Sequence, residues 1–206
     1  MGVVKVMIED GPQPIETENG RLLLKLARST LMEKFGRRLP ADEDARLQSA
    51  RSDPQLQARR GTFVTLMLKG NLRGCIGNLS ATDPLAKGIQ RNAVNAAFQD
   101  PRFAPLTEKE LDQVSIEISI LTEPRPVPYA TSEELLEKLR PHVDGVILRQ
   151  GYASATFLPQ VWEQLPKAED FLGHLCLKAG LPRDAWRRSK LEVATYQVQR
   201  FDEQIQ

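Results

Sequence analysis

The sequence predicts an α+β protein with antiparallel sheets, and three observations support this fold class. Residues 62–68 are rich in β-branched and aromatic residues, and the glycine and asparagine of Lys69-Gly70-Asn71 suit the positive φ of a tight hairpin turn. Residues 114–121 alternate strictly between apolar and polar, which is typical of a strand with one buried face. Helical patterns stand between the strands without a regular strand–helix–strand repeat. Hairpins rather than βαβ units are therefore expected, which favours α+β over α/β.

The N-terminal third is expected to be mainly helical. Residues 3–8 form a short apolar stretch, read as a brief strand or ordered arm. Residues 21–35 carry apolar side chains at spacings of three and four, so they predict a helix, with Asn19 as its cap. The polar, arginine-rich segment 39–61 is expected to hold a short helix capped by Asp42, and its mixed charge favours a solvated surface.

The hairpin is followed by a helix and a stiff connection. Pro84, directly after Thr82-Asp83, is the residue preferred at the first helical position, and the helix is expected to continue to about Phe98. Its apolar face consists largely of small residues, which lets it lie close to a sheet. Two prolines stiffen residues 100–106, and Thr107 is expected to cap a short turn of helix.

A proline-rich stretch, Pro124 to Pro128, is the best candidate for a domain boundary. Beyond it, the sequence predicts helices over 132–139, 159–162 and 168–179, and strands over 146–148, 153–158 and 191–201.

Composition excludes several classes of function. The 206 residues are 41% hydrophobic and 27% charged, with a net charge of +1, so nothing draws the whole protein to nucleic acid or to an anionic membrane. No apolar run has the length of a membrane span, and none resembles a secretory signal. The two cysteines have no metal-ligand spacing and are expected to be reduced thiols in a cytoplasmic protein.

The stretch Leu72-Arg73-Gly74-Cys75-Ile76-Gly77 is the most distinctive in the chain. Glycines inside a strand usually mark a bulge or a close approach to the backbone. On a regular strand, Arg73 would share a face with Cys75, and an ion pair between them would lower the thiol pKa. Cys75 is therefore a candidate nucleophile or proton donor, although no histidine lies near it in sequence to act as its base. The alternative is a small, packed hydrophobe that lines a ligand site or a domain junction.

Glu117 is the second candidate for chemistry. It lies on the polar face of the predicted strand 114–121. If that face lines a cleft, Glu117 could bind a cation, accept a proton or hold Arg73 in place. The alternative is an ordinary solvent-facing carboxylate, because most alternating strands are wet on one side.

Other polar residues give weaker signals. Arg102, held in the stiff Asp-Pro-Arg-Phe segment, could clamp a carboxylate or phosphate or simply pair with Asp100. His142 and His174 lack the spacing of a zinc site, so no metal site is expected. No motif identifies a cofactor, and the two glycines around Cys75 are not part of a phosphate loop.

Four motifs in order resemble the AMMECR domain family, known in bacteria and archaea as AmmeMemoRadiSam system protein A. They are the LRGCIG hexapeptide, the NAxxAAxxDPRFxPL run from Asn92 to Leu106, the DGVIL turn and the TFLPQVW run. The resemblance covers nearly the whole chain. It implies a fold more than an activity, because the family's biochemical role is not settled.

The resemblance implies two subdomains with a cleft between them. The larger would comprise residues 1–124 and 190–206, and the smaller residues 125–189. The hexapeptide side chains would face the cleft, with the expected ligand-binding residues Arg73, Gly74, Ile76, Gly77, Asn92 and Arg102. The family's name also implies a pathway shared with Memo-type and radical SAM proteins, which are possible partners.

Two hypotheses of function follow. In the first, the cleft around Cys75 and Glu117 binds or modifies a small molecule. In the second, the hexapeptide surface is a non-catalytic adaptor or substrate-presenting site that docks a partner protein. An older idea, a link to transcription or translation, is disfavoured by the neutral charge.

Overall fold

The computed structural model describes residues 13–203, and the expected strand over residues 3–8 lies outside them. The chain divides into two compact units. The first comprises residues up to Leu121 together with Gln199 and beyond, and the second runs from Thr122 to Val198. Each contains one four-stranded sheet, so the predicted α+β class is confirmed.

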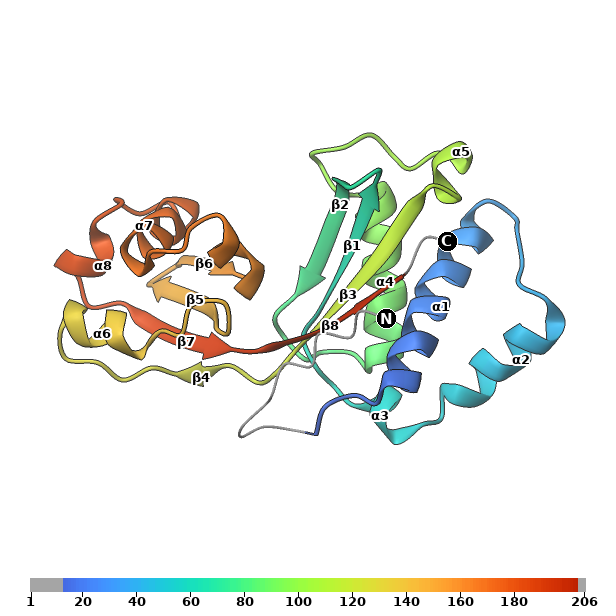
Figure 1. Ribbon diagram of the computed structural model, residues 1–206, viewed down its shortest axis with the longest axis horizontal. Helices are drawn as coiled ribbons and strands as arrows, with labels where there is room; N and C mark the ends of the chain where they lie inside the picture. The colour runs from blue at the N-terminus through green and yellow to red at the C-terminus, as the bar shows by residue number, and fades with distance from the viewer. Residues whose placement is uncertain (1–12, 204–206) are drawn as a thin grey trace. The chain divides into compact units, whose positions relative to one another are not determined.

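The first unit consists of a sheet with strand order β2-β1-β3-β8 and helices on one of its faces (Figure 1). β1 pairs antiparallel with both β2 and β3. Its strands are β1 (Thr62–Leu68), β2 (Asn71–Asn78), β3 (Val114–Leu121) and β8 (Val198–Asp202). Its helices are α1 (Thr17–Lys34), α2 (Ala41–Ala50), α3 (Pro54–Gln57), α4 (Leu85–Phe98) and α5 (Glu108–Leu111).

The core of this unit lies between the sheet and the helices α1 and α4. Val64, Leu66, Ile116 and Ile118 point to this side and are fully or almost fully buried against apolar residues of both helices. α4 lies close to the sheet: a Cβ added to Gly74 would come within 2.1 Å of the carbonyl oxygen of α4 residue 96. Small residues on the helix and glycine on the strand therefore make the same close approach possible.

The β1–β2 hairpin differs from the expected turn. Lys69 and Gly70 take positive φ values of 51° and 79°, while Asn71 already pairs with Leu68 in the ladder. A two-residue turn with positive φ at both positions matches the twist of the strands it joins. A few residues from the turn, the register of the β1–β2 pair shifts between Leu66 and Met67. This shift is a β-bulge, in which Arg73 is the extra residue on β2.

Two expected helix caps were wrong. α1 begins at Thr17, before Asn19, whose buried side-chain amide instead donates to Gln55 Oε1 at 2.9 Å. α2 begins at Ala41 with Pro40 at the cap, so Asp42 lies in its first turn. The cap on Thr107 is confirmed as part of a full capping box.

The second unit is a sheet of order β4-β7-β5-β6 whose pairs are all antiparallel. Its core is aromatic, with Trp162 stacked on Phe171 at 3.7 Å between ring centroids. Its strands are β4 (Arg125–Pro126), β5 (Gly145–Gln150), β6 (Ala153–Phe157) and β7 (Glu192–Tyr196). Its helices are α6 (Ser132–Lys138), the 3₁₀ helix η1 (Pro159–Glu163), α7 (Ala168–Lys178) and α8 (Ala185–Arg188).

The return from the second unit to the first lies later in the chain than the expected residue 190. The single strand predicted over 191–201 is two strands: β7 pairs with β4 and β5 in the second sheet, whereas β8 lies beside β3 in the first. Apolar residues run through both strands, so the change of sheet at Gln197 leaves no mark in the apolar pattern. The predicted cleft between the units stays a prediction.

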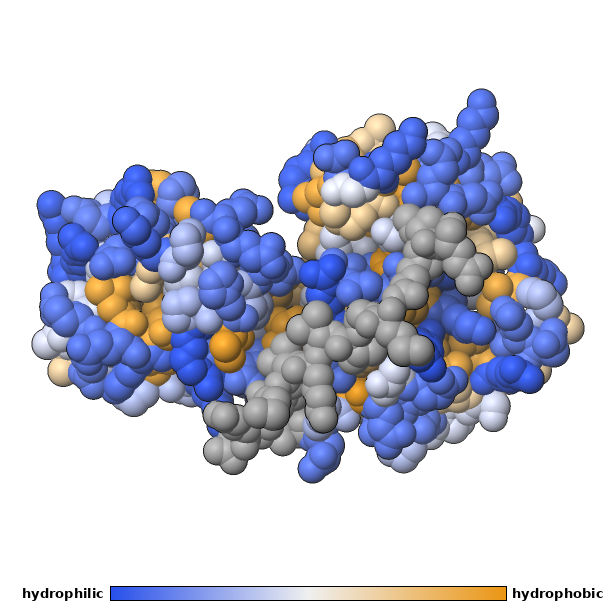
Figure 2. All heavy atoms as spheres, viewed as in Figure 1, coloured by the Kyte–Doolittle hydropathy of each residue, from blue (hydrophilic) through white to orange (hydrophobic). Residues whose placement is uncertain are grey.

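The face of the molecule in Figure 2 is mostly hydrophilic, with apolar residues in separated patches. The exposed large hydrophobic side chains of Leu72, Tyr152 and Leu177 come from different elements. Within residues 13–203, no helix has the length and apolar character needed to cross a membrane.

Candidate functional site

A row of polar side chains crosses the first sheet on the face opposite α1 and α4. The ladder places Cys75 of β2 opposite Thr65 of β1, and Thr65 opposite Glu117 of β3. Because side chains alternate along a strand, all three point away from the helix-covered core. Arg200 of β8 extends the row, with its Nη2 atom 2.8 Å from Glu117 Oε2. These four residues are called the Cys75 row below.

The middle of the row is buried although it is polar, while Cys75 and Arg200 at its two ends are half-buried. Glu117 is 9% exposed and Thr65 8%, and Ser119, the next residue of β3 on this face, is 1% exposed. Polar groups in such a setting are costly unless they are paired, and an apolar row would be cheaper for folding alone. Their presence is therefore a reason to look for function at this face.

Cys75 is held as a protonated thiol. Burial raises the pKa of the Cys75 thiol above its ordinary value, and the nearby carboxylates of Glu117 and Asp100 raise it further. A hydrogen bond from Thr65 Oγ1 to Sγ, at 3.3 Å, and the charge of Arg102 act in the opposite direction and are outweighed. The arrangement suits a proton donor or a packed polar group more than a nucleophilic thiolate.

Arg73 does not pair with Cys75 as the sequence indicated. Its guanidinium donates from Nε and Nη2 to the Glu110 carboxylate at 2.9 and 3.2 Å, which lowers the pKa of Glu110 to about 2. The bulge explains the difference, because the extra residue on β2 breaks the simple alternation of side chains. Arg73 Nη1 is buried and has no hydrogen-bond partner within the described part of the chain.

The backbone of Cys75 is held by two side chains of the segment that follows α4. β2 is an edge strand, so the amide and carbonyl of Cys75 have no neighbouring strand on that side. The Asp100 carboxylate accepts from the Cys75 amide at 2.9 Å, and Arg102 Nη2 donates to the Cys75 carbonyl at 3.2 Å. Asp100 and Arg102 are also paired with each other at 2.7 Å. This set of contacts is called the edge clamp.

The edge clamp is electrostatically tight. The Asp100 side chain is only 2% exposed and accepts four hydrogen bonds, three of them from Arg102. The Arg102 guanidinium holds the pKa of Asp100 well below its usual range, and Asp100 in turn raises the pKa of Arg102. Arg102, which the sequence offered as a ligand clamp or a partner of Asp100, is paired with Asp100.

Glu117 is engaged at the far end of the row. Arg200 lies between Glu117 and Asp202, donating from Nε to Asp202 Oδ1 at 2.7 Å. The predicted alternatives for Glu117 included a solvent-facing side chain, and its burial contradicts that alternative. It does not hold Arg73, which is occupied by Glu110.

The other expected ligand-binding residues lie in different surroundings. Asn92 is on the core side of the sheet, where its amide donates to Thr62 O, Thr62 Oγ1 and Asn78 Oδ1 at 2.9–3.1 Å. Gly74 faces α4, and Ile76 packs against the core. Gly77 shares the face of Cys75 but lies under the Phe63 ring: a Cβ added to Gly77 would come within 2.3 Å of a ring carbon. Of the expected site residues, the structure thus brings Cys75, Glu117 and Gly77 to one face.

Four residues of the site were not singled out from sequence: Thr65, Asp100, Glu110 and Arg200. Glu110 and Arg200 carry no local motif that links them to Cys75, because their partners are 37 and 83 positions away in the chain. Asp100 was recognisable as a partner of Arg102, and its contact with the Cys75 backbone depends on the packing of α4. Within residues 13–203, no three metal-ligating side chains gather.

The fold and the site together define a class of protein: a two-unit α+β chain with the hexapeptide on the edge strand of its first sheet. The AMMECR1 family model matches residues 24–201, and the chain belongs to the AMMECR1 family.

Archaeal relatives match along nearly their whole length. A protein of Methanothermobacter thermautotrophicus is 39% identical over 195 residues, covering 92% of this chain and 97% of its own. A protein of Methanosarcina acetivorans is 42% identical over 190 residues, covering 91% and 92%. The crystal structure of the uncharacterised protein PH0010 from Pyrococcus horikoshii is 33% identical, has a TM-score of 0.78 and covers 92% of this chain and 94% of that one. These similarities support the fold and the family, and the names of these three proteins give no activity.

Proposed function

We propose that the protein binds, and in doing so helps to modify, a small polar molecule at the Cys75 row. The observation that carries the proposal is a buried carboxylate and a buried hydroxyl in register with a half-buried thiol, on a sheet face that α1 and α4 leave uncovered. Fold stability alone would favour apolar side chains there.

The chemistry of the row indicates what such a molecule would offer. Glu117 is a hydrogen-bond acceptor already next to Arg200, so it suits a donor or cationic group of the ligand. The raised pKa keeps Cys75 protonated at neutral pH, so its S–H group serves as a weak donor or a proton source. A role as proton donor is therefore favoured over attack by a thiolate.

The edge clamp supports the same proposal. It fixes the backbone of Cys75 from outside the sheet, so the position of the thiol does not depend on the mobility of an edge strand. Arg102 and Arg73, both within 6 Å of the Phe103 ring centroid, line the segment that provides this support.

The cellular setting is part of the proposal. Cys75 and Cys176 are both free thiols, which suits the reducing cytoplasm. From the resemblance to the AmmeMemoRadiSam system protein, we propose that the small molecule belongs to a pathway shared with Memo-type and radical SAM proteins. Co-purification with those proteins from cells expressing all three tests this part separately.

The proposal is tested by thermal unfolding with a low-molecular-mass fraction of cell extract. A ligand of the row raises the midpoint of the wild-type protein, because binding to the native state stabilises it by mass action. Glu117→Gln and Cys75→Ser should lose most of that shift, whereas the exposed-pair variant Asp170→Asn should keep it. Equal shifts in all four proteins would refute a site at the row.

The adaptor hypothesis has one observation in its favour. Leu72, the first residue of the hexapeptide, is 41% exposed, which is unusual for a large apolar side chain. Its neighbours Gly74 and Ile76 are turned to the core, so the docking surface would be small. If a partner protein binds there, Leu72→Ser should abolish its binding while Glu117→Gln leaves it intact.

A further inference from the structure

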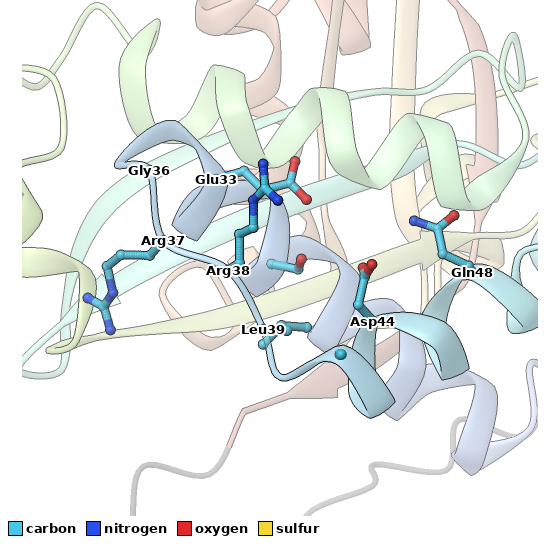
Figure 3. A pocket seen from close by; sticks show the side chains of 9 residues that line it. Glu33, Gly36, Arg37, Arg38, Leu39, Asp44 and Gln48 are labelled. Carbon is cyan, nitrogen blue, oxygen red and sulfur yellow. The ribbon is translucent and has the colours of Figure 1, made fainter.

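Two places in the first unit bring polar side chains together, and they differ in burial. The hollow between α1 and α2 is lined by side chains that include Glu33, Arg38, Asp44 and Gln48 (Figure 3). These four residues are exposed, so water satisfies their polar groups. The Cys75 row has its carboxylate and its hydroxyl buried, and the residues around it indicate what kind of molecule it binds.

Phe63 of β1 lies beside the Cys75 row on the same face of the sheet. The ladder places it opposite Gly77 of β2 and opposite Ser119 of β3, one step along the ladder from the row. Diagonal neighbours on one face of an antiparallel sheet are about 7–8 Å apart, which is within reach of an aromatic side chain. Phe63 is such a neighbour of both Cys75 and Glu117.

The Phe63 ring leans across Gly77. A Cβ on Gly77 would come within 2.3 Å of the ring, so a larger residue at this position would displace it. An aromatic ring over an edge glycine stabilises a sheet by itself. Phe63 is nevertheless only half-buried, and within residues 13–203 it belongs to neither hydrophobic core and contacts no other ring or cation. Part of its surface is therefore accessible beside the row.

The charges next to Phe63 favour a cation. Arg200 pairs with both Glu117 and Asp202, so the two carboxylates carry one negative charge in excess of the guanidinium. The Cys75 thiol is protonated and adds no charge. A ligand with one positive charge complements this set of groups.

We propose that the molecule bound at the Cys75 row carries a planar cationic nitrogen group, of the amidine or guanidine class, that lies on the Phe63 ring and donates to Glu117. The inference rests on the proposed function and adds the chemical class of the ligand. A planar cation makes both contacts at once: the face of the ring attracts its charge, and its N–H groups donate to the carboxylate. A carboxylate has about four acceptor sites, so Glu117 can hold Arg200 and a ligand together.

Binding of benzamidine, followed by ¹H–¹⁵N NMR on the full chain, tests the inference. Benzamidine should shift the amide signals of Cys75 and Gly77, with a dissociation constant of about 1 mM or lower. Benzamide, its neutral isostere, and benzoate, its anionic counterpart, should bind at least about tenfold more weakly.

Variants separate a binding role of Phe63 from a merely structural one. Glu117→Gln should weaken benzamidine binding by about tenfold or more, and Phe63→Leu by about three- to tenfold. Phe63→Tyr keeps the ring and should bind within about twofold of the wild type. Phe35→Leu is the matched control, because Phe35 is also half-buried but packs on the helix side of the sheet, and it should bind benzamidine as the wild type does.

The inference is overturned if benzamidine and benzamide bind equally well, or if Phe63→Leu binds benzamidine as the wild type does while circular dichroism shows it folded. It is also overturned if benzamidine does not bind at millimolar concentration. In that case the extract fraction distinguishes the two proposals. If the fraction still raises the unfolding midpoint of the wild type but not of Glu117→Gln, the row binds a molecule of another class; if it raises neither, both proposals fail.

Discussion

Removal of the Asp100 carboxylate should destabilise the first unit more than its place on a surface segment suggests. Asp100→Ala leaves the Cys75 and Arg102 amides without their acceptor and leaves the Arg102 guanidinium without its partner. Asp100→Asn keeps an acceptor oxygen near both amides and removes only the charge.

The magnitude follows from these contacts. A hydrogen bond to a charged group contributes about 1.5–3 kcal/mol, and two backbone amides lose one in Asp100→Ala. The Arg102 side chain is 53% exposed and regains water, so its pair adds about 1 kcal/mol or less. We therefore expect a loss of about 3–5 kcal/mol for Asp100→Ala and about 1–2 kcal/mol for Asp100→Asn.

The pH dependence has a definite sign. Because the pKa of Asp100 is depressed in the folded state, its stabilisation is complete above the unfolded value of about 3.9 and is lost as the pH falls towards the folded pKa. The stability difference between the wild type and Asp100→Asn should accordingly shrink between pH 5 and pH 2.

Urea unfolding followed by circular dichroism measures these differences, with constant slopes as the check on two-state behaviour. Asp112→Asn is the matched control in the same unit, since Asp112 pairs with Arg37 and is 68% exposed. It should cost about 0.5 kcal/mol or less. A loss below 0.5 kcal/mol for Asp100→Ala at pH 7 would refute the role of the edge clamp.

Three further predictions concern the neighbouring contacts. Gly74→Ala should lower the free energy of unfolding in urea by about 3 kcal/mol, since its Cβ would lie 2.1 Å from a carbonyl oxygen of α4. Gly70→Ala, in open space at positive φ, should lower it by about 1 kcal/mol. Equal losses in the two variants would contradict the close approach of α4. Glu110→Gln should lower the free energy of unfolding by about 2–3 kcal/mol at pH 7, because it leaves the buried Arg73 charge uncompensated. The difference in stability between this variant and the wild type should fall as the pH drops from 4 to 2. A stability difference that is constant with pH would argue against the ion pair. Iodoacetamide labelling of Cys75, read peptide by peptide, should reach half its maximal rate above the ordinary thiol pKa of about 8.5, and a plateau below pH 7 would restore the nucleophile hypothesis.

Much of the fold follows from local patterns in the sequence. The strict alternation over Val114–Leu121 predicts β3 with both its ends, and Thr107 identifies the start of α5. These elements were predictable because their signals, period-two burial and a capping box, act within a few residues.

The parts that could not be predicted depend on contacts between distant segments. The pairing of Arg73 with Glu110 depends on a single extra residue in β2. The glycines of the hexapeptide indicated a bulge or a close approach, but they did not indicate which residue would be the extra one. Asn92 gave a functional signal although it ties α4 to β1 and β2 in the core, because one polar side chain in an apolar helix serves either purpose. The division of residues 191–201 between two sheets likewise depends on distant strands. β7 pairs with β4 and β5, and β8 lies beside β3, and the local sequence pattern does not encode these partners.

Protection of Cys75 from alkylation tests the proposed function most directly. Wild-type protein and Glu117→Gln are labelled with iodoacetamide at pH 8.5, with and without the low-molecular-mass extract fraction, and Cys75 labelling is quantified by mass spectrometry. Cys176, in the core of the second unit, reports any general change in stability. A ligand at the row should slow labelling of Cys75 in the wild type several-fold, with little effect in Glu117→Gln and none on Cys176. Unchanged labelling of Cys75 in the wild type would contradict a small-molecule site at the Cys75 row.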